Sequence, residues 1–225
     1  MFWASPQRSW RDRRKVQEEG PLWAIVPVKG LSSAKSRLSP VLSPSQRAML
    51  VVAMLWRTLQ VLARVDVLSR ILVVSDDPRI QAIVADIEGV HYLRETGTGG
   101  LNAALSQAAR YAGAAGARAL LVIPGDLPRL TPSAVRLMLQ QVTPPVVAIA
   151  PDRREQGTNA LLVAPPDVIP FAFGRHSFRK HCEEAHIRGV EPRIIRDERL
   201  ATDLDLPEDL TFADGLISSG DTQRS

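Results

Sequence analysis

The stretch ALLVIPGDLP, residues 119–128, decides the fold. Its first five residues are apolar without interruption, which is typical of a strand buried on both faces of a sheet. The loop that follows holds one carboxylate, Asp126, between two prolines that restrict the backbone. In open α/β sheets, ligands bind beyond the carboxyl ends of the strands. The stretch therefore predicts a central strand with a functional aspartate directly after it.

On both sides of this stretch, strand patterns alternate with helix patterns. Short apolar runs followed by turn residues predict strands, and a capping residue before proline predicts a helix start. Alternation with short connections favours an α/β fold, a largely parallel sheet with helices on both faces. The expected strands are residues 22–28, 71–75, 90–93, 119–123, 146–150, 159–163 and 193–195, and the expected helices are residues 44–64, 77–85, 101–112 and 177–187, with two more starting at Thr131 and Pro207.

Length and charge limit the class of protein. The 225 residues suffice for one large domain, expected at residues 21–216, between a disordered basic extension (1–20) and a flexible tail (217–225). The net charge is +4 and the basic residues are scattered, which favours polyanionic metabolites over nucleic acid as partners. A basic arm that binds nucleic acid is the alternative reading of the extension.

Two further features bear on the cellular compartment. The longest apolar run, residues 49–56, is far too short to span a membrane. The single cysteine, Cys182, cannot form an internal disulfide. We therefore expect a cytoplasmic protein with no membrane partner.

The loop after the first expected strand contains Lys29, Gly30, Lys35 and Arg37. Glycine permits close approach of a ligand to the backbone, and lysine and arginine bind phosphate groups. The spacing is neither a Walker A motif nor a Gly-x-Gly-x-x-Gly motif. This segment is a candidate triphosphate-binding loop, with a solvated basic surface loop as the alternative.

Other candidates for nucleotide contact lie near helix starts. Asp76 ends an expected strand and could touch a nucleotide, although turn formation would explain it equally, and Asp77 is most simply a helix cap. Gly99 and Gly100 belong to a glycine-rich loop before a helix, where free amide groups can bind an anion. A plain flexible loop is the alternative for the two glycines.

Three aspartates are candidate metal ligands: Asp126, and the pair Asp203 and Asp205. In an extended segment, residues i and i+2 project the same way, so the pair would repel unless a cation lay between the two carboxylates. Magnesium prefers carboxylate and phosphate oxygens. The alternatives are a turn aspartate at Asp126 and an exposed acidic turn before Pro207.

The sequence offers no clear covalent nucleophile. His176, His181 and His186 recur at spacing five, which does not bring them onto one face of a helix. Cys182 lies in the same expected helix and is interpreted as a packing residue, and no Gly-x-Ser-x-Gly elbow occurs. A reaction whose nucleophile is already ionised would need none of these groups.

Five motifs occur in order along the chain: VPVKG (26–30), AKSRL (34–38), PGDLP (124–128), GTNA (157–160) and TDLD (202–205). Together they resemble the 2-phospho-L-lactate guanylyltransferase family, which includes the bacterial phosphoenolpyruvate guanylyltransferases. That family makes the activated intermediate for the deazaflavin coenzyme F-420. The resemblance covers roughly residues 22–215, and the N-terminal extension, which departs from the family pattern, inherits no role.

The resemblance implies a single-domain nucleotidyltransferase fold of the nucleotide-diphospho-sugar transferase type, with a mostly parallel mixed sheet. It implies GTP as donor, a three-carbon phospho-acid as acceptor and Mg²⁺ as cofactor. The resemblance implies metal binding for Asp126, Asp203 and Asp205, and acceptor binding for Thr158, Gly174 and Ser177. It implies nucleotide binding for Lys29, Gly30, Lys35, Arg37, Gly99 and Gly100, to which Asp76 is added for its place at the end of a strand. The residues expected to act in catalysis are Asp126, Lys29 and Lys35.

Several questions stay open at this point. Phosphoenolpyruvate is the first choice of acceptor, with 2-phospho-L-lactate and 3-phosphoglycerate as alternatives. Rival functions are another nucleotidyltransferase of the same fold, using molybdopterin or a sugar phosphate, and a GTP-binding module without turnover. The oligomeric state is also open, a homodimer included.

Overall fold

The computed structural model describes residues 20–32 and 35–213. The predicted extension at residues 1–20, apart from Gly20, and the predicted tail at residues 217–225 lie outside the described residues. In the described part, no helix is long and apolar enough to cross a lipid bilayer.

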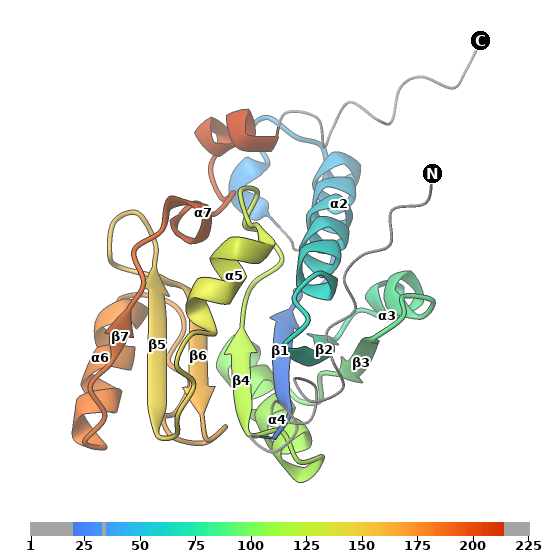
Figure 1. The fold of residues 1–225 in the computed structure, drawn as a ribbon. Helices are drawn as coiled ribbons and strands as arrows, with labels where there is room; N and C mark the ends of the chain where they lie inside the picture. The colour runs from blue at the N-terminus through green and yellow to red at the C-terminus, as the bar shows by residue number, and fades with distance from the viewer. Residues whose placement is uncertain (1–19, 33–34, 214–225) are drawn as a thin grey trace, which may run out of the picture.

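Seven strands form one mixed sheet in the order β3-β2-β1-β4-β6-β5-β7 (Figure 1). Every neighbouring pair is parallel except β4 with β6 and β5 with β6, so β6 alone runs against the others. The predicted mostly parallel mixed sheet is confirmed. The strands are β1 Leu22–Pro27, β2 Leu68–Ser75, β3 Val90–Arg94, β4 Ala119–Val122, β5 Val146–Pro151, β6 Thr158–Ala164 and β7 Arg193–Ile194.

The helices agree with the predicted ones to within two residues at most ends. The main helices are α2 Pro44–Ala63, α3 Pro78–Val84, α4 Gly100–Ala114, α5 Pro132–Met138 and α6 Ser177–Ile187. The helix expected at Pro207 is a 3-10 helix, η2 Pro207–Ala213. Two short elements were not predicted, η1 Ser36–Leu38 and α7 Glu198–Ala201. They are too short to carry a periodic apolar pattern.

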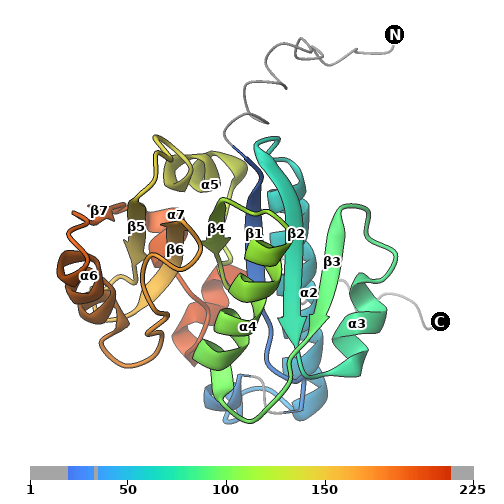
Figure 2. The same ribbon diagram turned by 90° about the horizontal axis from the view of Figure 1, so that it is seen from below.

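Helices cover both faces of the sheet (Figure 2). On β1, Ala24 and Val26 belong to the buried cluster that contains residues of α2, α3, α5 and α7, whereas Trp23 and Ile25 belong to the cluster that contains residues of α4 and α6. The same alternation divides β4, whose four residues are all buried. Because both faces are covered, β1 and β4 contain no polar side chains, as the apolar run at residues 119–123 predicted for β4.

Three helices begin at the predicted pair of a capping residue and proline. Ser43 caps α2, Thr131 caps α5 and Asp77 caps α3, and each side chain accepts a hydrogen bond from a backbone N–H of the first turn. The caps fix where the chain turns from the carboxyl end of a strand or a loop into a helix.

Asp77 does more than cap α3. Its buried carboxylate accepts hydrogen bonds from Leu31 N–H at 2.8 Å and from Arg79 N–H at 2.9 Å. The Arg79 guanidinium also pairs with it, and this pairing holds the pKa of Asp77 well below its ordinary value despite burial. Asp77 therefore ties the loop after β1 to the start of α3.

We predict that Asp77→Ala lowers the free energy of unfolding by about 2–3 kcal/mol at pH 7, because a cap is lost and the Leu31 N–H is left without its partner. Urea denaturation measures the change. The exposed neighbour Asp76 provides the control, since Asp76→Ala should cost less than about 0.5 kcal/mol. Equal losses in the two variants would contradict this role for Asp77.

Candidate active site

A cleft of about 610 Å³ opens beyond the carboxyl ends of β1, β2, β3 and β4. Side chains of α2 and α4 form its walls, and the loop after β1 and the PGDLP loop after β4 form its polar parts. Parallel strands bring their carboxyl ends to the same sheet edge, which explains why distant motifs meet here. The lining includes eight of the predicted site residues: Lys29, Gly30, Lys35, Arg37, Asp76, Gly100, Asp126 and Asp205.

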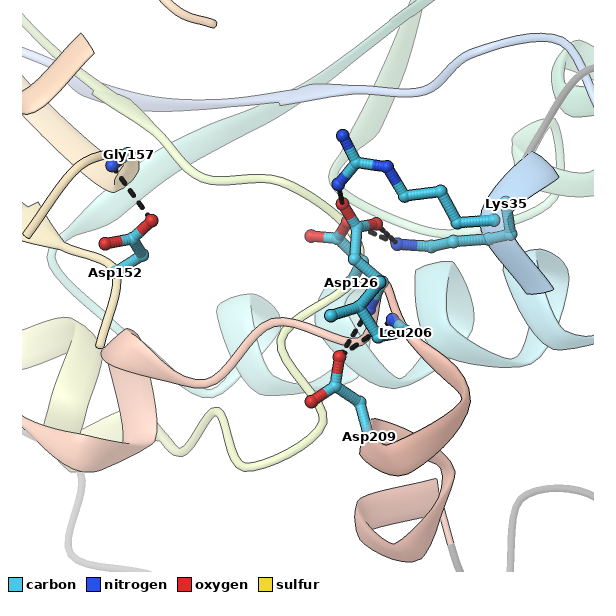
Figure 3. Close-up of polar contacts among 8 residues, drawn as sticks. Lys35, Asp126, Asp152, Gly157, Leu206 and Asp209 are labelled. Carbon is cyan, nitrogen blue, oxygen red and sulfur yellow. Dashed lines mark hydrogen bonds and ion pairs between the residues drawn. The ribbon is translucent and has the colours of Figure 1, made fainter. Parts of the chain in front are cut away.

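At the centre of the site, the ammonium group of Lys35 lies between two carboxylates (Figure 3). Lys35 Nζ is 2.6 Å from Asp126 Oδ2 and 2.9 Å from Asp205 Oδ1. The exposed Arg37 approaches the other oxygen of Asp205 at 3.5 Å. The predicted meeting of the PGDLP loop with the TDLD motif is therefore observed for Asp126 and Asp205, with a lysine between them.

Backbone contacts hold the two acidic segments together. Leu204 N–H donates to the backbone oxygen of Asp126 at 3.1 Å, and the Leu204 side chain is buried. Asp209 Oδ2 accepts hydrogen bonds from Asp205 N–H at 3.0 Å and Leu206 N–H at 2.8 Å (Figure 3). Asp209 itself pairs with Arg153. The position of Asp205 is thus set by backbone bonds as well as by the charge of Lys35.

Ionisation follows from this arrangement. Burial works to lower the pKa of Lys35, but the charges and hydrogen bonds of Asp126 and Asp205 outweigh it, so the pKa is raised. For Asp205, burial works to raise the pKa, and the charge of Lys35 outweighs it, so the pKa is lowered. At neutral pH Lys35 is a fixed cation and Asp205 a fixed anion.

The pKa of Asp203 is raised, in contrast to that of Asp205. Burial raises its pKa, the charge of Asp126 raises it further, and the charge of Asp205 adds to the effect, while Lys35 only partly compensates. Asp203 is not among the residues that line the cleft. It is the carboxylate of the three whose charge the protein compensates least.

The residues present suit magnesium. In the part of the chain that the structure describes, no three His, Cys, Asp or Glu side chains are grouped closely enough to enclose a metal ion. However, Asp126 Oδ1 is buried and has no hydrogen-bond partner among the described residues, and burial and the neighbouring acidic charges raise the pKa of Asp203. Carboxylate oxygens whose charge is not compensated by hydrogen bonds are available to a cation, and Mg²⁺ prefers oxygen ligands. The metal-binding role of the three aspartates stays a prediction.

The backbone of Lys35 is strained. Its φ of 52° and ψ of 42° lie in the left-handed region, which costs a non-glycine residue roughly 1 kcal/mol or more. Such a conformation persists only where the surroundings fix it. The two bonds from Nζ to carboxylates on distant segments provide that restraint.

The nucleotide-binding candidates lie on the β1, β2 and α4 side of the cleft. A Cβ at Gly30 would lie 3.4 Å from Asp76 Oδ1, an ordinary van der Waals contact, so the cleft has room for no more than a small side chain beside Asp76. Gly100 has a φ of +69° at the start of α4 and lines the cleft, whereas Gly99 does not line it. Sequence reasoning missed Glu95, which lines the cleft after β3 and has its pKa raised by burial and by Asp76.

The acceptor-binding candidates form a separate group that does not line this cleft. Thr158 begins β6, and Ser177 begins α6 with its N–H bonded to the Gly174 oxygen at 3.1 Å. The turn before Thr158 is fixed by Asp152, which accepts a bond from Gly157 N–H at 2.9 Å (Figure 3). A Cβ at Gly157 would lie 2.8 Å from that carboxylate, which explains the glycine of the GTNA motif.

A second residue that sequence reasoning set aside is His181. Its ring contacts Thr158 Oγ1 at 2.9 Å and is fully buried. The spacing of His176, His181 and His186 shows only whether they share a face of one helix. It could not reveal that His181 contacts Thr158 on β6.

We predict that Asp203→Asn raises the denaturation midpoint at pH 7. Folding raises the pKa of Asp203, so its charged form is less stable in the folded protein than in the unfolded chain. At pH 7 this charge therefore lowers the free energy of unfolding, and below the unfolded pKa, where the carboxyl group is neutral, it does not. Removing the charge stabilises the fold at neutral pH only. Chemical denaturation at pH 7 and pH 3 measures the effect, which should vanish at pH 3. The exposed Asp167, changed to Asn, is the control and should show no such pattern. A lower midpoint for Asp203→Asn at pH 7 would contradict the prediction.

Comparisons with known proteins bear on the family and on the fold. The family model described as "Guanylyl transferase CofC like" matches residues 22–223. A phosphoenolpyruvate guanylyltransferase from Rubrobacter xylanophilus is 46% identical over 190 residues, covering 84% of this chain and 91% of the relative. A 2-phospho-L-lactate guanylyltransferase from Methanothermobacter thermautotrophicus is 36% identical over 188 residues, covering 83% of this chain and 81% of the relative.

A solved structure supports the fold type. A Desulfovibrio desulfuricans protein described as a nucleotide-diphospho-sugar transferase superposes with a TM-score of 0.71, covering 91% of this chain and 90% of its own. At 19% identity this likeness bears on the fold alone. The family match spans nearly all of the domain, and the family resemblance seen in the five motifs is confirmed. The chain belongs to the CofC-like guanylyl transferase family.

Proposed function

We propose that the protein transfers GMP from GTP to the phosphate of a three-carbon phospho-acid and releases pyrophosphate, as a step toward the deazaflavin coenzyme F-420. Phosphoenolpyruvate is the first choice of acceptor, with 2-phospho-L-lactate second, because the relative at 46% identity carries the former name. The observation that carries the proposal is the fixed cation of Lys35 between Asp126 and Asp205 in a cleft at the strand ends.

The reaction needs charge control rather than a base. An oxygen of the acceptor's phosphate attacks the α-phosphorus of GTP, and the bond from that phosphorus to the bridging oxygen of the β-phosphate breaks. Pyrophosphate leaves with the electron pair. Because the attacking oxygen is already ionised at pH 7, no side chain has to remove a proton. This chemistry fits a cleft rich in Lys, Arg and Asp.

The cationic side chains of the loop after β1 would neutralise the phosphates of GTP. Lys35 keeps its proton at neutral pH, because its pKa is raised, and the exposed Lys29 and Arg37 line the same cleft. Fixed charges of this kind act in the transition state without further reorganisation. Gly30 leaves room beside them for a ligand to approach the backbone.

Asp126, Asp203 and Asp205 would hold magnesium in the working enzyme. Bound there, Mg²⁺ would supply positive charge that offsets the phosphates of both substrates. The protein's own contribution is to hold the two acidic segments side by side against the repulsion of their carboxylates, using the backbone bond from Leu204 to Asp126. Thr158, Gly174 and Ser177 would receive the acceptor.

We predict that purified protein releases pyrophosphate from GTP and Mg²⁺ when phosphoenolpyruvate is present. Initial rates with phosphoenolpyruvate, 2-phospho-L-lactate and 3-phosphoglycerate, each against a no-acceptor blank, identify the preferred acid, which we expect to be phosphoenolpyruvate. A sugar phosphate serves as the control acceptor and should give no release. Absence of release with every phospho-acid would reject the proposed reaction.

We predict that Asp126→Asn lowers kcat at least about 100-fold and leaves the fold intact, because it removes charge but little volume. The dependence of the rate on Mg²⁺ concentration is measured together with the denaturation midpoint. The matched control is Asp167→Asn, an exposed carboxylate on the loop after β6, which should behave as wild type. Near-wild-type activity of Asp126→Asn with an unchanged Mg²⁺ dependence would exclude Asp126 as a ligand.

A further inference from the structure

His181 joins two parts of the acceptor-binding group from inside the protein. Its side chain is completely buried in α6. Nδ1 lies 2.9 Å from Thr158 Oγ1, and Nε2 lies 3.0 Å from the backbone nitrogen of Ala172. Both ring nitrogens are therefore in use, one on β6 and one on the segment before α6.

The two contacts fix which nitrogen carries the proton. The Ala172 N–H can only donate, so Nε2 must accept and carries no hydrogen. Burial, helped by the charge of Lys180, lowers the pKa of His181 to about 4, so the ring is neutral at pH 7. The single ring hydrogen is then on Nδ1 and is donated to Thr158 Oγ1.

This tautomer determines what the Thr158 hydroxyl can do. A hydroxyl that accepts from the histidine has its own hydrogen left to donate. Groups that only accept hydrogen bonds, such as a carboxylate or an ionised phosphate, match a hydroxyl held in this way. The donor role of the Thr158 hydroxyl, which is compatible with an anionic acceptor, thus follows from the protonation of a fully buried residue.

The position of Thr158 is suited to meet the acceptor. In the antiparallel pair of β4 and β6, Val122 is opposite Leu161. Because β6 runs antiparallel to β4, its first residue, Thr158, lies toward the edge of the sheet where β4 ends. Thr158 therefore belongs to the same sheet edge as the charged centre, although it does not line the cleft itself.

The segment at Ala172 and Phe173 is held from a second side. The Asn102 side chain on α4 accepts from Phe173 N–H at 2.8 Å and donates to the Phe173 oxygen at 3.1 Å. The Phe173 ring also meets the His181 ring edge-on, with centroids 4.9 Å apart. The segment that leads into Gly174 is thus fixed by two contacts with His181 and two hydrogen bonds with Asn102.

We propose that His181 is a positioning residue for the acceptor: it orients the Thr158 hydroxyl as a donor to an anionic oxygen of the phospho-acid and fixes the backbone that leads into Gly174. This inference rests on the proposed function, since it takes the phospho-acid to bind beside Thr158.

Kinetics with two variants test the proposal. Thr158→Val removes the hydroxyl, and His181→Gln keeps an amide near Nε2 but removes the donor to Thr158. Each should raise the KM for phosphoenolpyruvate about 10-fold or more, the value of a hydrogen bond to a charged group, and leave the KM for GTP unchanged. His186→Gln is the control on the same helix, because His186 is exposed, and should match wild type.

The double variant separates positioning from a merely structural role. If His181 acts through the Thr158 hydroxyl, His181→Gln should raise the KM for phosphoenolpyruvate little further once Thr158 is valine. Additive losses, or an unchanged KM in both single variants of an active enzyme, would overturn the inference. Lack of turnover by the wild type with every phospho-acid would instead count against the proposed function.

A spectroscopic measurement tests the inference without turnover and without any variant. Long-range proton–nitrogen correlation spectra of the wild-type protein should show His181 as the neutral Nδ1–H tautomer at pH 7. The Nε2–H tautomer, or a charged ring at that pH, would overturn the proposed orientation of Thr158 even if the enzyme is active.

Discussion

The lysine ammonium between Asp126 and Asp205 is the interaction on which the rest of the site depends. It joins Lys35 to Asp126, which lies 91 positions further along the chain, and to Asp205, which lies 170 positions further along. Two part-buried carboxylates this close would repel each other strongly without a cation between them. The backbone bond from Leu204 to Asp126 sets the distance, and Lys35 makes the distance electrostatically tolerable. The strained backbone of Lys35 is a cost that these contacts offset.

Much of the architecture could be predicted because the signals are local. Buried strands appear as apolar runs, and a capping residue before proline marks a helix start wherever it occurs, as at Ser43, Asp77 and Thr131. Asp126 could be singled out since it directly follows a buried strand. The direction of β6 could not, because a strand buried on both faces has the same apolar pattern whichever way it runs.

The parts of the site that escaped prediction all depend on contacts between distant segments. The loop after β1 was expected to bind phosphate, and nothing in its sequence indicates that Lys35 also bridges two carboxylates. Glu95 and His181 are single residues without a motif, and their environments become visible only once β2 and β6 are in place. The reversal of β6 is what brings its first residue, Thr158, to the edge where the parallel strands end.

The Asn102 side chain has a consequence for how the two halves of the site communicate. Because its amide bonds both backbone groups of Phe173, the start of α4 and the segment before α6 move as one unit. One of these lies beside the cleft and the other beside Thr158 and Ser177. If binding of one substrate orders this unit, the other substrate binds more tightly, and the coupling free energy is the same in both directions. Cooperativity between two substrates would therefore need no domain closure in this single-sheet protein, only the shared contact between Asn102 and Phe173.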